Sequence, residues 1–220
     1  DTKNEVELLS YNLDKLIPRS DGGAILIAEQ YFIEERYNRN NYPYAGAFGY
    51  GYSPWGWYDP WYSPWGFNGW NDPYGFRYGN RQADYYFNYN DIIVVNIKPD
   101  GEIQWSARIP KRQVSVNDGG ISSSYAMSTI ADKLVFIYNE DPRNLDSRSK
   151  KYYADSPDKN SVVVLAEVNR NGKVSIAPLF GNKNEGIVTR PKICRQIGKK
   201  EMAIYGESGR TYRFGTLEFE

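Results

Sequence analysis

The sequence contains no histidine among its 220 residues. Histidine is the commonest general base in enzymes and the commonest protein ligand of transition metals. Its absence excludes serine and cysteine nucleophiles that depend on an imidazole base, and it removes a main ligand of the usual zinc sites. We therefore expect no catalytic residue, no metal site and no cofactor, and we interpret the chain as a non-enzyme.

Cysteine is almost as scarce, because Cys194 is the single one and no disulfide can form within the chain. It lies in the segment 189–195, which predicts the beginning of a strand. A nucleophilic role would need the imidazole partner that this chain lacks. We interpret Cys194 as a small buried apolar side chain.

Neither sign of charge predominates. The 27 Lys and Arg residues balance 27 Asp and Glu residues, and the formal net charge is zero. Nucleic-acid binding needs an excess of basic charge to displace counterions from the phosphates, so we expect no nucleic-acid partner. No uncharged apolar run approaches the roughly 18 residues of a membrane helix, so we expect no membrane-spanning segment.

The sequence is rich instead in β-branched and aromatic runs, which form two similar hairpins. In chain order, the expected strands are 91–97 and 102–109, then 161–168 and 173–179. The turns contain Asp100-Gly101 and Asn171-Gly172, and such pairs supply the positive φ angles of tight hairpin turns. The hairpins lie about 71 positions apart, which indicates a structural repeat.

Short apolar strands complete the repeated unit. They are expected at 23–29, 133–139 and 200–206, with a further strand at 211–219. First strands are expected near 13–17, 123–130 and 190–197. Residues 4–17 also fit a short helix, with an irregular strand as the alternative.

A unit of about four antiparallel strands, repeated about every 70 residues, is typical of propeller blades. We count two full units and a third that lacks its last strand, whereas propellers typically have four to eight blades. The expected fold is therefore all-β, with antiparallel four-stranded repeats in a partial or incomplete β-propeller. A β-sandwich or an open meander is the alternative.

We expect one domain over residues 1–220, interrupted by an insertion at about 36–84 that is rich in Tyr, Trp, Gly and Pro. Five of the six tryptophans lie there, and Ser-Pro-Trp-Gly occurs at both 53–56 and 63–66. The repeated Pro and Gly exclude a regular helix or a central strand. Disordered segments are poor in aromatic residues, so we expect this segment to pack onto something.

Three interpretations of the insertion remain open. In the first, it covers its own sheet. In the second, it docks on a partner protein through aromatic hot spots, and in the third, it stacks on sugar rings or rests at a membrane interface. The expected partner-binding residues are Trp55, Trp57, Trp61, Trp65, Trp70, Tyr58, Tyr62 and Phe67.

Paired carboxylates are the remaining route to catalysis, as in glycosidases. The candidates are Glu29, Glu34, Glu35, Asp91, Asp118, Glu140 and Asp141. Their spacing singles out no pair, so we interpret them as charges at strand edges and in loops.

Several of these strand motifs also resemble a known group of proteins. The segments that carry the likeness are 21–31, 90–97, 100–105, 109–113 and 138–141. They look like those of uncharacterised propeller-like cell-envelope proteins of Bacteroidota. The resemblance implies export and a place in the periplasm or at the outer-membrane surface, and it carries over no catalytic residue.

The expected function is a non-catalytic binding or scaffold subunit of a cell-envelope assembly at the outer membrane. Its partner would be a protein that docks on the aromatic insertion. The alternative is a carbohydrate-binding module or a histidine-free carbohydrate-active protein, with a glycan as the ligand.

Overall fold

The computed structural model of the chain describes residues 10–37, 83–145 and 156–219. It is all-β, with 63% strand and 7% helix, which confirms the expected fold class. The chain divides into two units, residues 1–36 with 84–220 and residues 37–83, and nearly all of the second lies outside the described residues. Within the described ranges, no helix is long and apolar enough to cross a membrane.

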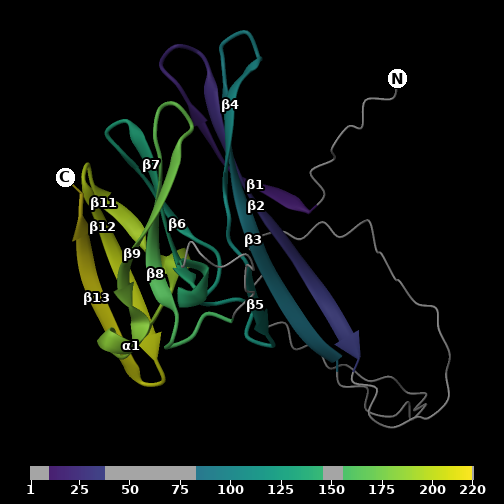
Figure 1. The fold of residues 1–220 in the computed structure, drawn as a ribbon, viewed down its shortest axis with the longest axis vertical. Helices are drawn as coiled ribbons and strands as arrows, with labels where there is room; N and C mark the ends of the chain where they lie inside the picture. Colours follow the sequence, from purple (N-terminus) through teal and green to yellow (C-terminus); the bar gives the residue numbers. More distant parts are fainter. Residues whose placement is uncertain (1–9, 38–82, 146–155, 220) are drawn as a thin grey trace, which may run out of the picture. The chain divides into compact units, whose positions relative to one another are not determined.

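The first sheet, sheet A, contains five antiparallel strands (Figure 1). They are β1 (Tyr11–Pro18), β2 (Ala24–Tyr37), β3 (Ala83–Ile97), β4 (Ile103–Ile109) and β5 (Gln113–Val116). Both β4 and β5 pair with β3, at opposite ends of that long strand, so the sheet is four strands across.

The second sheet, sheet B, is a four-stranded meander. Its strands are β6 (Ala126–Ile130), β7 (Lys133–Glu140), β8 (Val162–Val168) and β9 (Val174–Gly181), with the short 3-10 helix η1 (Pro142–Leu145) after β7. Each strand pairs with the next along the chain, so sheet B has the strand order expected for one complete repeat.

The third sheet, sheet C, is narrower. Its elements are the short helix α1 (Asn182–Glu185), β10 (Val188–Thr189), the 3-10 helix η2 (Pro191–Ile193), β11 (Arg195–Gly198), β12 (Glu201–Ser208) and β13 (Thr211–Glu218). Both β10 and β11 pair with β12, whose other neighbour is β13. Sheet C is therefore three strands across, as expected for a unit that lacks its last strand.

The two predicted hairpins are present, and their turns are alike. The backbone amide of Lys98 donates to the Glu102 carbonyl, and that of Asn169 donates to the Lys173 carbonyl. Gly101 and Gly172 have φ angles of 87° and 77°. Only glycine adopts such angles without strain, which explains the Asp-Gly and Asn-Gly pairs.

Two apolar clusters hold the sheets together. The first joins residues of sheet A, such as Ile92 and Val94, to Phe136 and Val164 of sheet B. The second joins Ala126, Ile137 and Val163 of sheet B to Cys194, Met202 and Ile204 of sheet C. Because neighbouring residues of a strand point to opposite faces, β7 supplies Phe136 to one cluster and Ile137 to the other. Sheet B is thus packed on both faces.

The structure decides between two open alternatives and corrects one expectation. Over residues 11–17 the chain forms the irregular strand β1, the alternative to a short helix, and a bulge between Leu13 and Lys15 explains its irregular pattern. The expected strand at 190–197 is interrupted, because Pro191 begins the 3-10 helix η2 and β11 starts only at Arg195.

Candidate functional site

The expected partner-binding residues, Trp55, Trp57, Trp61, Trp65, Trp70, Tyr58, Tyr62 and Phe67, all lie outside the described residues. Docking through the insertion therefore stays a prediction. The insertion leaves β2 at Tyr37 and enters β3 at Ala83, close to the boundaries expected from the sequence.

The most unusual polar feature of sheet A is a buried ion pair. The Lys111 side chain is 0% exposed, and its Nζ lies 2.7 Å from Oε1 of Glu29, which is 5% exposed. Lys111 Nζ also donates to the Tyr89 carbonyl at 3.0 Å and to Gln113 Oε1 at 3.1 Å. The second Glu29 oxygen accepts from the Ser124 hydroxyl at 2.6 Å. Both charged groups thus have hydrogen bonds beside their ion pair, as burial requires, although Glu29 Oε1 itself is met only by the Lys111 charge.

A second lysine reaches this cluster from sheet C. Lys192 Nζ donates to the Tyr89 hydroxyl at 2.6 Å and lies 4.2 Å from the centre of the Tyr89 ring. Burial lowers the pKa of Lys192. The Tyr89 ring also stacks on Tyr31, with ring centres 4.5 Å apart. Glu29, Tyr89, Lys111, Ser124 and Lys192 form what we call the polar cluster.

Asp14 lies at the bulge of β1, beside this cluster. Its carboxylate accepts from the Tyr125 hydroxyl at 2.7 Å. Burial raises the pKa of Asp14 to about 6, and the nearby Glu29 raises it further, while the bond from Tyr125 opposes the change. The raised pKa places the titration of Asp14 within about one pH unit of neutral.

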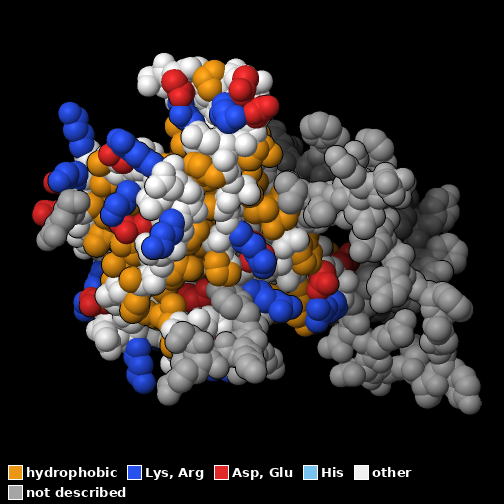
Figure 2. Space-filling view, turned by 45° about the horizontal axis from the view of Figure 1, so that its top comes forward, with side chains coloured by type: hydrophobic (Ala, Val, Ile, Leu, Met, Phe, Trp, Pro, Cys, Tyr) orange, Lys and Arg blue, Asp and Glu red, His pale blue; other side chains and the backbone are white. Residues whose placement is uncertain are grey.

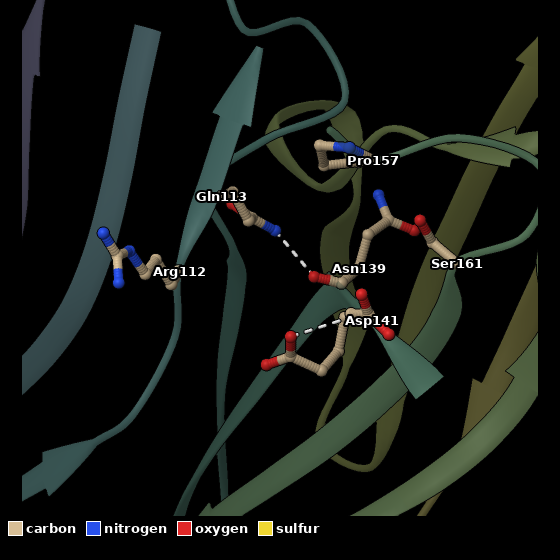
Figure 3. A pocket seen from close by; sticks show the side chains of 7 residues that line it. Arg112, Gln113, Asn139, Asp141, Pro157 and Ser161 are labelled. Atoms are coloured by element: carbon tan, nitrogen blue, oxygen red, sulfur yellow. Dashed lines mark hydrogen bonds between the residues drawn. The ribbon is translucent and has the colours of Figure 1, made fainter. Parts of the chain in front are cut away.

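Asn139, near the end of β7, connects all three sheets. Its Nδ2 donates to the carbonyls of Ser122 and Thr189, both at 2.8 Å, and its Oδ1 accepts from Asn182 Nδ2 at 2.8 Å. Its carbonyl accepts from Gln113 Nε2, which reaches across from β5 (Figure 3). Asn139 is fully buried, so these bonds replace every contact with water.

The residues around Asn139 line a shallow depression but leave no room for a water-sized molecule. Asp141, drawn beside Asn139 in Figure 3, is committed to Arg143, whose hydrogen bonds hold the pKa of the carboxylate below its usual range. We therefore assign this cluster of amides and carboxylates a structural role, because its polar atoms bond to one another and no ligand fits between them.

A larger opening, the hairpin cleft, lies among the turns of sheets A and B. Its volume is about 760 Å³. Arg19 spans one wall and donates to Asn96 Oδ1 at 2.6 Å and to Gln104 Oε1 at 3.0 Å. Trp105 also lines the cleft, and its indole N–H donates to the Arg170 carbonyl at 2.8 Å. Amides, a guanidinium and an indole are groups that proteins use to bind sugar hydroxyls and rings.

Three of the carboxylates considered for catalysis bond to groups other than carboxylates. Glu29 bonds to Lys111, Asp91 bonds to Arg108, and Asp118 accepts from the backbone amide of Gly120. Within the described ranges, no three metal-binding side chains gather. Cys194 is buried, as expected, and burial raises the pKa of its thiol, which disfavours the reactive thiolate.

The polar cluster is the feature that sequence reasoning missed. In the sequence Lys111 is half of the short basic pair Lys111-Arg112, and Glu29 is one of several candidate carboxylates at the end of an apolar strand. A signal was nevertheless present, because Glu29 continues the alternation of Ile25 and Ile27 toward the core. A charge at an inward position requires a buried partner.

The packing of the three sheets shows a further regularity. In sheet A, Ile92 and Val94 pack on sheet B, and the residues 71 positions later in sheet B, Val163 and Leu165, pack on sheet C. We call this side of each sheet its forward face. Because both hairpins turn in the same way, residues 71 positions apart occupy equivalent places in sheets A and B.

We call the opposite side of each sheet its rear face, and its packing also repeats from sheet to sheet. Leu134 and Phe136 of β7 pack on sheet A. In β12, Met202 and Ile204 occupy the same positions after the hairpin turn and pack on sheet B. Each interface thus joins one forward face to one rear face, so the sheets are stacked head to tail.

Comparisons with protein-family models, with the curated proteins and with solved structures found no match for this chain.

Proposed function

We propose that this chain is a non-catalytic scaffold: a section of an incomplete β-propeller that belongs to a cell-envelope assembly and docks on a protein partner through its aromatic insertion. The head-to-tail packing of sheets A, B and C carries the proposal. Propellers are built by repeating one such interface around an axis, whereas a sandwich has a single interface between two sheets.

The polar groups support a scaffold rather than an enzyme. In the polar cluster Lys111 is paired with Glu29 and Lys192 donates to Tyr89, and Asn139 bonds to segments of all three sheets. Buried polar networks of this kind rigidify a fold and specify one arrangement. They provide a fixed frame at β2 and β3, the two strands that the insertion joins.

The insertion supplies the docking residues in this proposal. Tryptophan and tyrosine are the residues that most often dominate the binding energy of protein interfaces. The likeness to envelope proteins of Bacteroidota, noted in the strand motifs, gives the proposed setting at the outer membrane or in the periplasm.

An affinity capture from native membranes tests this function. We would compare the intact chain with a variant in which a Gly-Ser linker replaces residues 40–80, and identify captured proteins by mass spectrometry. Loss of a stoichiometric partner from the linker variant is the expected result. Equal capture by both chains would refute docking through the insertion.

Point variants refine the same experiment. Trp61→Ala with Trp65→Ala should weaken capture, because it removes two aromatic anchors. Trp61→Phe with Trp65→Phe is the matched control, because it keeps an aromatic ring at both positions and should retain most of the binding. Circular dichroism of both variants separates a loss of binding from a loss of folding.

A glycan-binding function is the second candidate, and the hairpin cleft is the observation that favours it. The cleft combines Trp105 with the side chains of Arg19, Asn96 and Gln104. A glycan array with the intact chain, followed by tryptophan fluorescence of Gln104→Ala, tests it. An array without any bound sugar would remove this candidate.

A further inference from the structure

Sheet A exposes an apolar rear face. Val164, Ala166, Val168 and Val174 of sheet B pack in the interface with sheet A. The residues 71 positions earlier are also apolar, and they are Ile93, Val95, Ile97 and Ile103. The first three are half-buried and Ile103 is 64% exposed. The rear face of sheet A thus has the apolar side chains of an interface, but no other sheet among the described residues packs on it.

Sheet C exposes an apolar forward face. Ile137, Val163 and Leu165 of sheet B belong to its interface with sheet C. Matching strand registers place Tyr205, Tyr212 and Phe214 of sheet C at the corresponding positions. The ring of Phe214 lies 5.0 Å from that of Tyr205 and 6.2 Å from that of Tyr212.

This aromatic row is open to solvent, since Tyr212 is 66% exposed and Phe214 is 74% exposed. Apolar side chains reach the surface over much of the described part of the chain that Figure 2 shows. Soluble proteins rarely leave contiguous apolar faces uncovered, and such faces mark interaction sites.

The two open faces are complementary. The rear face of sheet A is aliphatic and the forward face of sheet C is aromatic. In the two interfaces within the chain, a forward face likewise packs on a rear face. We propose that the forward face of sheet C binds the rear face of sheet A in a second copy of this chain. This inference rests on the proposed scaffold function and names a partner for it.

The charges beside the apolar side chains of the two faces are already paired. Asp91 and Arg108, on the rear side of sheet A, already form a pair with Nη2 and Oδ2 2.6 Å apart. Glu207, beside the aromatic row, is paired with Arg190 and accepts from the Tyr205 hydroxyl. No unpaired charge among these residues has to be buried, which is the main electrostatic cost of an interface.

Head-to-tail contacts close when the rotation between copies allows it. Two copies would bring six sheets together, within the range of about four to eight blades in known propellers. Each copy would then use both of its open faces, and the continuous stack A–B–C would repeat once around the ring.

Sedimentation of the 220-residue chain tests the proposal. We expect a particle of twice the 25.3 kDa chain mass. Ile103→Asp and Phe214→Asp each place a charge on one open face, and each variant alone should sediment as a monomer. Both positions are largely exposed in the single chain, so folding should be unaffected.

A mixing experiment distinguishes the head-to-tail contact from a symmetric one. The Ile103→Asp chain keeps an intact sheet C face, and the Phe214→Asp chain keeps an intact sheet A face. An equimolar mixture should therefore form a dimer through one interface, although neither variant associates alone. Ile121→Asp, at a 44% exposed loop position outside both faces, is the control that should remain dimeric.

Three results would overturn the proposal: a wild-type chain that stays monomeric at about 100 μM, a dimer that survives either substitution, or a mixture that fails to associate. Capture of a partner through the insertion by a monomeric chain would leave the proposed function standing and remove only this contact. Dimerisation without any captured partner would support this contact and count against docking through the insertion.

Discussion

Replacing Lys111 with methionine should destabilise the fold strongly, because it removes one half of a buried ion pair. The Lys111 ammonium lies 2.7 Å from Glu29 and makes two further hydrogen bonds, to the Tyr89 carbonyl and to Gln113. Methionine fills a similar volume but provides no charge. The variant therefore leaves the Glu29 carboxylate in the core with the Ser124 hydroxyl as its remaining donor among these contacts.

The expected loss follows from the burial of both groups. Removing one partner of a buried pair costs about 3–5 kcal/mol. The 2.6 Å bond from Ser124 stays in place, so we expect a value near the lower end, about 3 kcal/mol. Single domains are stable by only about 5–15 kcal/mol in total, so this is a large fraction of the free energy of unfolding.

Urea unfolding followed by far-ultraviolet circular dichroism measures the change. Adding Glu29→Leu to Lys111→Met should recover most of the lost stability, since an apolar pair of similar volume replaces a buried ion pair at little cost.

The matched control is Lys133→Met. Lys133 pairs with Glu167 at 3.2 Å, but the two side chains are 52% and 31% exposed. Such surface pairs contribute at most about 1 kcal/mol. If Lys111→Met cost no more than this control, or if the added Glu29→Leu lowered stability further, the reasoning about a buried, mutually dependent pair would be refuted.

Three further variants test other parts of the structure. Gly172→Ala places a Cβ 2.8 Å from the ring of Trp105, whereas Gly101→Ala, at the equivalent turn, meets nothing within 4 Å. Both substitutions strain a residue with a positive φ, but only Gly172→Ala also crowds the Trp105 ring. Urea unfolding should therefore show Gly172→Ala to be less stable than Gly101→Ala by about 2 kcal/mol, and equal losses of stability would contradict the close packing. Asp14→Asn should flatten the pH dependence of stability. Because the pKa of Asp14 is raised to about 6, the folded wild type becomes less stable as pH rises from about 4 to 6. The change in the free energy of unfolding should be at most about 1 kcal/mol, since the residue is partly exposed. An unchanged titration curve would contradict that. Asn139→Ala should cost about 3 kcal/mol in thermal or urea unfolding, because it orphans buried partners in three segments, and a loss below about 1 kcal/mol would argue against its connecting role.

The hairpins of sheets A and B could be predicted from the sequence because their signals are local. Alternating apolar residues end at Asp100-Gly101 and at Asn171-Gly172, and the required positive φ angles fix where the chain turns. The 71-residue spacing indicated the repeat before any contact between strands was known. Residues 4–17 fitted both a helix and an irregular strand because a bulge in β1 shifts the strand alternation toward helical spacing, and the described residues 11–17 form the strand.

The polar cluster could not be predicted in the same way because its members are brought together by packing. Glu29 is 82 residues from Lys111, and Tyr89 is 103 residues from Lys192. Local patterns give the direction of a side chain within its own strand, but not which loop of another sheet supplies its partner. The expected docking residues of the insertion remain a prediction, since they lie outside the described residues.

The open faces of sheets A and C show what a repeat adds to such reasoning. By itself, an exposed Phe214 is unremarkable, because much of any protein surface is apolar. Its meaning comes from Leu165, the residue in the same register position of sheet B, which packs between sheets. The same comparison assigns Ile103 to the position of Val174. Phe214 and Ile103 thus each match a residue that is partly buried in an interface, and they lie on the two opposite ends of one stack. A missing neighbour leaves this pattern, since scattered surface residues have no reason to follow the register of an interface.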